Sequence, residues 1–161
     1  MDITPQDFRD ALRHFAAGVT IVTSKAGERV HGMTVSAFTS ISVEPPLVAV
    51  AIGRDAGLTP LLTAEGAGFA VNILAAEHVE LSDRFAFVKD EDRFDLGRWE
   101  VAATGAPVLA DALSWLDCRL EAYHEAGSHN VFLGRVVASR VRPEGGTPLV
   151  YWDRAYRRLA P

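Results

Sequence analysis

The sequence predicts a mainly β fold, a closed or partly closed antiparallel barrel with two or three short helices. Three observations support this. About seven short runs rich in β-branched and aromatic residues are separated by turn residues at hairpin spacing. Apolar residues make up 48% of the chain, which supplies a core and argues against disorder. The length of 161 residues fits a single domain, residues 1–161.

The first predicted element is an N-terminal helix. Thr4 can cap it, Pro5 suits its first turn, and Asp7 completes a variant of the capping box. The apolar residues that share one face at helical spacing are Phe8, Leu12 and Phe15. We expect the helix to end at Gly18.

The first half of the chain then changes to short β-rich runs. The predicted strands are residues 19–24, 30–38, 47–52 and 69–74. The run 47–52 is apolar on both faces, as expected of a strand covered on two sides. Short helices are predicted from Thr59 to about Gly66 and over residues 77–85.

The second half contains the longest predicted strands. Residues 86–98 are charged and aperiodic, which favours a loop. Strands are predicted over residues 115–123, 129–142 and 149–152. Both faces of residues 130–141 are largely apolar, so one face can line the barrel while the other needs a covering helix or a second subunit. We therefore expect a homodimer.

Composition excludes several function classes. The formal charge of −5, from 16 basic and 21 acidic residues, argues against a nucleic-acid binder. There is no apolar run long enough for a membrane span and no signal-peptide pattern, so we expect a cytoplasmic protein. Cys118 is the single cysteine, which excludes an internal disulfide and a multi-thiolate zinc site. The scattered histidines predict no metal site, and phosphate-loop, dinucleotide-fingerprint and hydrolase motifs are absent.

The most unusual segment is residues 32–42, GMTVSAFTSIS. Serine and threonine alternate with apolar residues, and the small side chains leave the backbone accessible. The segment is either an amphipathic strand with a hydroxyl face or a cradle for a flat ring with polar edges.

Six spaced segments together resemble one family. They are GVTIVT at 18–23, GMTVSAF at 32–38, PPLV at 45–48, FAVNIL at 69–74, GSH at 127–129 with FLGRV at 132–136, and PLVYW at 148–152. In this order they are similar to the short-chain flavin reductases. The resemblance implies an FMN-binding split barrel of Greek-key type and a homodimer. It also implies that NADH or NADPH reduces FMN or FAD, which many members release to a partner monooxygenase.

The resemblance also implies which residues bind the cofactor. They are Thr34, Val35, Ser36, Ala37, Ser40, Ala51, Gly57, Thr59, Arg84, Phe85 and Tyr156. Residues 34–37 match the segment that contacts the isoalloxazine edge, and residues 51–59 match the segment near the ribityl and phosphate groups. Gly57 stands where the family often has serine. Arg84 and Phe85 have an equally good explanation as a helix-end cation and a core side chain.

His129 is the implied catalytic residue, because it matches a Gly-Asp-His turn that places an imidazole near the nicotinamide and the flavin. Ser128 stands at the usual aspartate position. Hydride transfer between the two rings needs no protein acid or base, so the protein would supply geometry and polarity. Two alternatives remain open: an enzyme with tightly held flavin acting on a small organic substrate, and a non-catalytic flavin-binding module.

Overall fold

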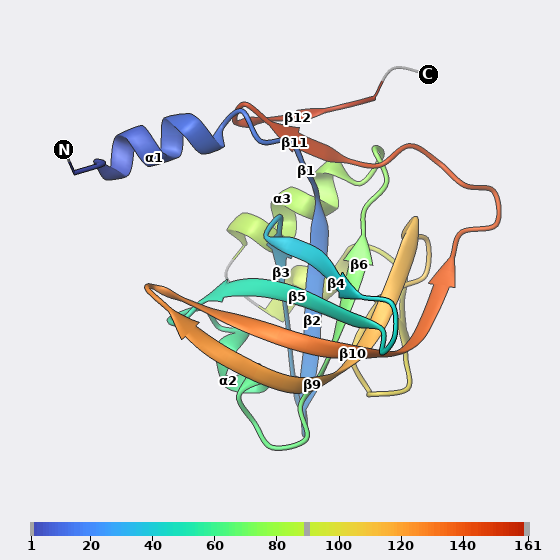
Figure 1. The fold of residues 1–161 in the computed structure, drawn as a ribbon. Helices are drawn as coiled ribbons and strands as arrows, with labels where there is room; N and C mark the ends of the chain where they lie inside the picture. Colours follow the sequence, from blue (N-terminus) through green and yellow to red (C-terminus); the bar gives the residue numbers. More distant parts are fainter. Residues whose placement is uncertain (1, 89–90, 160–161) are drawn as a thin grey trace.

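Seven antiparallel strands form one curled sheet in the computed structural model, which describes residues 2–88 and 91–159 (Figure 1). Their order is β3-β2-β6-β9-β10-β5-β4. The bounds are β2 Thr20–Ala26, β3 Arg29–Val35, β4 Phe38–Ser42, β5 Leu47–Gly53, β6 Gly68–Ile73, β9 Ser114–Ala126 and β10 His129–Val141. The two edge strands β3 and β4 are not paired with each other, so the barrel is split, as expected.

Two large apolar clusters hold this sheet. The first fills the barrel, where Phe69, Phe132 and Val50 are fully buried, and Leu58 and Leu62 beside the short helix α2 (Thr59–Leu62) join it. The second lies under α3 (Val79–Phe87). There Phe85 packs edge-on against Phe94 of the 3₁₀ helix η1 (Glu91–Asp95), with ring centroids 5.1 Å apart.

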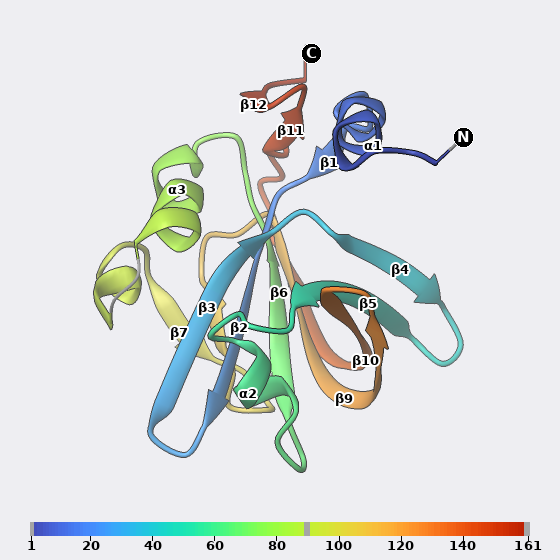
Figure 2. The same cartoon turned by 90° about the vertical axis from the view of Figure 1, so that its left-hand side faces the viewer.

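Two smaller sheets flank the barrel. The hairpin of β7 (Trp99–Val101) and β8 (Pro107–Leu109) packs beside β6 and β2. The three-stranded sheet β1-β11-β12 consists of Ala17–Gly18, Val150–Trp152 and Ala155–Arg157. Together with α1 (Pro5–Leu12), this sheet stands off one end of the barrel (Figure 2). We call α1 and the β1-β11-β12 sheet the satellite.

The predicted N-terminal helix forms but is shorter than expected. Both hydrogen bonds of the capping box between Thr4 and Asp7 are present. The helix ends at Leu12, however, and none of the residues of α1, all of which the structure describes, is buried. Phe8 and Phe15 remain 55% and 73% exposed, because the predicted apolar face packs against no barrel strand.

Other boundaries differ for local reasons. The strand predicted over residues 30–38 is two strands, β3 and β4, because the backbone turns at Ser36 and Ala37. The predicted loop 86–98 contains η1 and the end of α3, while its residues 89 and 90 lie outside the described part of the chain. The short strands β7, β8 and β12 were not predicted, since three residues are too few to show a period.

The two faces predicted for β10 are also modified. Register shifts against β9 fall between Leu133 and Gly134 and between Val136 and Ala138, which interrupts strict alternation. Phe132 is fully buried, whereas Val141 is 70% exposed. Helices α2 and α3 make their main contacts with β2 and β3. Among the described residues, no helix is long and apolar enough to cross a membrane.

Candidate functional site

The break between β3 and β4 creates the centre of the candidate site. The Val35 carbonyl accepts a hydrogen bond from Thr20 Oγ1 at 2.7 Å, and the Ala37 carbonyl accepts one from Ala51 N at 2.9 Å. These bonds fix both sides of the turn, so that Ser36 and Ala37 are exposed. The alternation of small and hydroxyl residues seen in the sequence therefore becomes an accessible backbone corner.

This corner forms one wall of a cavity on the surface of the protein. The cavity has a volume of about 430 Å³ and lies between Ser36 and Ala37, the first helix, and the turn joining β11 to β12. A second cavity of about 180 Å³ adjoins it, and both are lined by Ser36 and Tyr151. Cofactor pockets commonly have volumes of several hundred Å³, lined by apolar groups with a few polar atoms. The volume and the lining therefore fit a planar cofactor ring such as a flavin.

A chain of hydrogen bonds supports the second cavity. The hydroxyl of Thr34 donates to the Ser82 carbonyl at 2.6 Å. Tyr156 donates to Asp83 Oδ1 at 2.8 Å, and the buried Ser82 hydroxyl lies 2.8 Å from the same phenol oxygen. Burial, together with the neighbouring Asp83 carboxylate, raises the pKa of Tyr156, although the Ser82 bond opposes the rise. Tyr156 is thus held as a neutral phenol against the cavity wall.

A second group of predicted residues gathers where β5 ends and β10 begins. His129 pairs with Gly53 across these strands, and Arg54 N donates to the Ser128 carbonyl at 3.0 Å. The Ser128 hydroxyl lies 3.0 Å from His129 Nδ1. Ser128, which stands at the usual aspartate position, is therefore the hydrogen-bond partner of the imidazole in place of a carboxylate.

The turn from Gly53 to Thr59 accounts for Gly57. A Cβ atom on Gly57 would lie 2.9 Å from the ring of His31, so a serine side chain at this position requires that ring to move. Thr59 is 8% exposed and its hydroxyl donates to the Gly53 carbonyl at 2.8 Å. The Thr59 hydroxyl therefore already serves to close the turn.

Sheet pairing relates these two groups. Ala37 faces Ala51, and Ala51 pairs with Val131, two residues from His129. His129 thus lies roughly 10 Å across the sheet and 7 Å along it from Ala37. The fold brings the two groups to one end of the same three strands, within the span of one extended cofactor.

Eight of the twelve predicted site residues line neither cavity: Ala51, Gly57, Thr59 and His129 belong to the second group, and four others lie apart from both groups. Ser40 is exposed farther along β4, and the Val35 side chain points into the barrel core at 5% exposure. The Arg84 guanidinium donates to the Asp92 carbonyl through Nε at 2.9 Å. The Phe85 side chain is 1% exposed within the aromatic cluster. The arrangement therefore supports the structural explanation of these two residues, with Arg84 as a helix-end cation and Phe85 as a core side chain.

Several residues that line the site were missed by sequence reasoning. They are Arg9, Arg13, Tyr151, Trp152 and Arg154 around the larger cavity. His31 was also missed: Arg93 Nη1 lies 3.2 Å from its Nε2 and donates to the Gly32 carbonyl at 2.6 Å. Burial, and then the charges of Arg93 and Arg29, lower the pKa of His31. The signal that could have indicated this wall of the cavity was the pair of exposed aromatic residues in the N-terminal segment, Phe8 and Phe15.

Among the described residues, neither Cys118 nor the histidines form a reactive-thiol or metal-binding site. Cys118 is fully buried, and burial raises the pKa of its thiol to about 12, so the thiolate is not available near neutral pH. Within the described residues, no group of three or more His, Cys, Asp or Glu side chains has a metal-binding arrangement.

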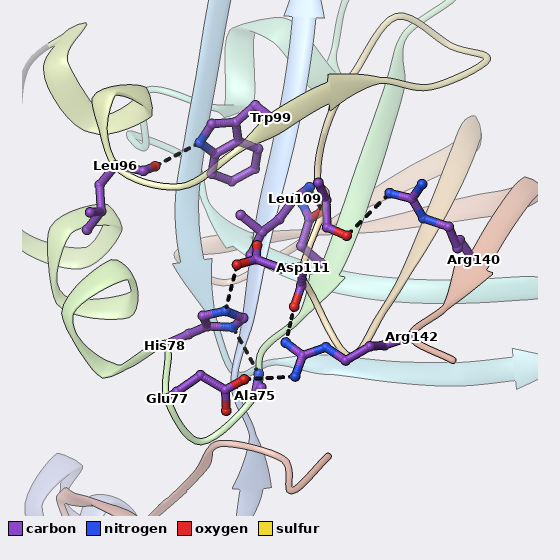
Figure 3. Close-up of polar contacts among 11 residues, drawn as sticks. Ala75, Glu77, His78, Leu96, Trp99, Leu109, Asp111, Arg140 and Arg142 are labelled. Atoms are coloured by element: carbon purple, nitrogen blue, oxygen red, sulfur yellow. Dashed lines mark hydrogen bonds and ion pairs between the residues drawn. The ribbon is translucent and has the colours of Figure 1, made fainter. Parts of the chain in front are cut away.

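A polar network elsewhere on the molecule has a structural role. Figure 3 shows His78 between Ala75 and Asp111, with Ala75 N donating to His78 Nδ1 at 3.1 Å. Arg142 donates to Glu77 at 2.8 Å and also to the Asp111 carbonyl. These contacts join the segment before α3 to the end of β10, and neither of the two cavities of the candidate site is lined by them.

Comparison with known proteins gives consistent matches over the full chain. The family model described as "Flavin reductase like domain" matches residues 12–160. A 4-hydroxyphenylacetate 3-monooxygenase reductase component from Thermus thermophilus is 42% identical over 94% of this chain and 95% of its own. A flavin reductase (NADH) from Kitasatospora aureofaciens is 43% identical over 94% of this chain and 80% of its own.

Solved structures agree with the sequence relatives. The NADH:FAD oxidoreductase SgcE6 from Streptomyces globisporus, in complex with NAD and FAD fragments, superposes with a TM-score of 0.90. It is 34% identical and covers 100% of this chain and 98% of its own. The predicted split-barrel fold is therefore confirmed.

Proposed function

Because this chain belongs to the flavin reductase-like domain family, we propose that it is an NADH-dependent reductase of FMN or FAD. The observation that carries the proposal is the cavity built on the accessible corner at Ser36 and Ala37, which has His129 and the turn at Gly53 near the same end of the sheet. Thiol chemistry does not compete with this assignment, since Cys118, the single cysteine, is buried as a thiol.

Each part of the site has a defined task. The Ser36 hydroxyl and the backbone at residues 34–37 bind the polar edge of the flavin ring, and Tyr156 closes the adjoining wall. The turn from Gly53 to Thr59 offers backbone groups to the ribityl and phosphate part. A flavin held here would supply the hydride-accepting chemistry that a dihydronicotinamide donor requires.

His129 acts as a positioning residue for the nicotinamide. Its ring is tied through Nδ1 to Ser128, which leaves Nε2 to face the ligand. The enzyme contributes by holding the two rings in contact and excluding water, because proximity and orientation dominate such a reaction. The apolar walls from Tyr151 and Trp152 serve this exclusion.

The homodimer is part of the proposal. Val137 and Val141 on β10 are 41% and 70% exposed, and α2 and α3 contact other strands, so a second copy is the cover that this face lacks. The two copies would bury like surfaces against each other.

The proposal also places this chain within a two-component system. The Thermus thermophilus relative is the reductase component of a monooxygenase, and we propose that this chain likewise supplies reduced flavin to a monooxygenase. It would act as one domain in the cytoplasm, where NADH is available.

The test is NADH oxidation by the purified protein with and without added FMN or FAD. We expect turnover that depends on added flavin. Flavin retained through purification with no stimulation by added flavin would favour direct action on an organic substrate. Flavin binding without NADH oxidation would instead indicate a non-catalytic module.

A further inference from the structure

The turn between β11 and β12 is strained. Asp153 (φ +50°) and Arg154 (φ +61°) are the only non-glycine residues in the left-handed region among those that the structure describes. Trp152 pairs with Ala155, so these two residues form the whole loop of a type I′ hairpin. Such turns strongly prefer Asn-Gly or Gly-Gly, because other side chains are disfavoured at positive φ. Backbone strain of this kind is typical of functional sites.

Asp153 has a structural explanation. Its carboxylate accepts a hydrogen bond from Arg13 Nε at 2.6 Å, and its backbone N donates to the Arg13 carbonyl at 3.1 Å. These two bonds join the hairpin to the end of the N-terminal helix. An aspartate at this position is therefore needed for the satellite itself.

Arg154 lacks a comparable explanation. Its side chain is 58% exposed, and its ion pair with Asp10 has a separation of 3.4 Å. Exposed pairs of this kind contribute little to stability. The strain at Arg154 is thus not offset by the contacts that the guanidinium makes within the protein.

The position of Arg154 supplies the missing reason. It lines the 430 Å³ cavity, together with Arg9 and Arg13 and opposite Ser36 and Ala37. The charged groups around this wall are the three arginines, Arg157, whose guanidinium lies 5.6 Å from the centroid of the Trp152 ring, and the carboxylates of Asp10 and Asp153. Arg13 is engaged by Asp153, which leaves the cavity mouth with a net positive charge beside the aromatic side chains of Tyr151 and Trp152.

We propose that Arg154 binds a phosphate group of the dihydronicotinamide dinucleotide, with Arg9 as its neighbour on the same wall. The proposal rests on the proposed function and adds how its hydride donor is recognised. Arginine forms paired hydrogen bonds to phosphate oxygens, and aromatic walls suit the flat rings that the phosphates connect. The strained turn is kept because it holds Arg154 at this wall of the cavity.

The decisive variant is Arg154→Gly, because glycine relieves the turn and removes the charge together. We expect its melting temperature to rise by about 2–4 °C. Its KM for NADH should rise about tenfold, with kcat little changed. Arg154→Lys keeps the charge but loses the paired hydrogen bonds, so it should retain only part of the NADH affinity, and it should show no gain in stability. Arg119→Gln, which removes an exposed cation from β9, is the matched control for charge.

Two pairs of substrates identify which phosphate is bound. NADH with riboflavin tests the donor's phosphates, and 1-benzyl-1,4-dihydronicotinamide with FMN tests the flavin's. The same benzyl donor with riboflavin lacks phosphate altogether, so wild-type turnover there tests the proposed function independently of Arg154. A KM increase confined to the pair of NADH and riboflavin supports the proposal. An increase confined to the pair of the benzyl donor and FMN, or an equal loss of turnover with all three pairs, overturns it.

A binding measurement without flavin completes the test. ADP-ribose carries the donor's phosphates without its nicotinamide, and it should raise the melting temperature of the wild type but not of Arg154→Gly. Equal protection of both proteins would overturn the proposal. A melting temperature that falls in Arg154→Gly would show that Arg154 is structural, and would overturn it as well.

Discussion

The barrel and the satellite are held together in opposite ways. In the barrel, buried polar groups are satisfied inside an apolar core: Asn72 donates to the Ile21 carbonyl at 3.0 Å and accepts from Leu109 N at 2.7 Å. In the satellite, α1 and the two residues after it contact the β11–β12 hairpin through exposed or half-exposed ion pairs and two hydrogen bonds. One runs from Trp152 Nε1 to the His14 carbonyl at 3.3 Å, the other from Asp153 N to the Arg13 carbonyl at 3.1 Å.

This difference divides the candidate site into two kinds of wall. The corner at Ser36 and Ala37 and the turn bearing His129 belong to the barrel, where packing fixes their positions. The opposite wall, with Arg9 and Arg154, belongs to the satellite and rests on weak contacts. A rigid wall suits the ring at which the chemistry takes place, whereas a weakly held wall can adjust as a second ligand enters.

The largest effect should come from a buried amide of the barrel. Asn72→Ala leaves the Ile21 carbonyl and the Leu109 N–H without partners, and we expect the free energy of unfolding to fall by about 3 kcal/mol. Urea denaturation measures this. Gln6→Ala, which removes an exposed amide from α1, should change it by less than about 0.5 kcal/mol. Comparable losses in both variants would contradict the division into a rigid barrel and a weakly held satellite.

The open face of β10 should give the next largest effect. Val141→Glu places a charge on the surface proposed for the second copy, and we expect the dimer dissociation constant to rise about 30-fold, equivalent to about 2 kcal/mol. Sedimentation across a concentration series measures it. Arg119→Glu serves as a control on the neighbouring strand. Unchanged association of the Val141 variant would remove β10 from the proposed interface.

His129 tests the rigid wall kinetically. His129→Ala should reduce NADH turnover about tenfold, or 1.4 kcal/mol in transition-state binding, while flavin affinity stays nearly intact. His124→Ala alters the other exposed histidine of the same hairpin and should have little effect. Equal loss of turnover and flavin affinity in the His129 variant would show that the residue is structural.

The smallest effect concerns His31, which packs on Gly57 at the edge of the rigid wall. Because the pKa of His31 is lowered in the folded protein, the unfolded chain takes up its proton first as pH falls. The stability associated with neutral His31 is therefore present above about pH 6.5 and is lost on acidification below it. Unfolding free energies between pH 7.5 and 5 should show a shallower decline for His31→Gln than for the wild type. A parallel decline in both proteins would rule out this contribution.

The sequence was informative where a local pattern and its surroundings agreed. The capping box of Thr4 and Asp7 formed as predicted, and the strand predicted over residues 115–123 lies within β9. The segment 32–42 was recognised as unusual from its hydroxyl and small residues. Its break into two strands was not predicted, because hydrogen bonds from distant residues, Thr20 and Ala51, define it.

Asp117 illustrates why other features escaped prediction. It is an acidic residue within the predicted strand 115–123, yet it is fully buried and accepts hydrogen bonds from Thr104 N at 2.8 Å and Thr104 Oγ1 at 2.5 Å. The partner lies in the loop between two three-residue strands that show no period. A strand's own pattern cannot reveal that another segment covers its polar face.

By itself, the sequence determined a one-cysteine β-barrel of the flavin reductase type, because strand periodicity and spaced motifs are local properties of the chain. Only the tertiary structure decided which residues line one cavity. Arg9 and Arg154 are separated by most of the chain and meet through the contacts of the satellite. Phe85 and Arg84 were drawn away from the cavity by packing and by the Asp92 carbonyl. Adjacency of this kind depends on how strands pair across the whole molecule, which no short segment encodes.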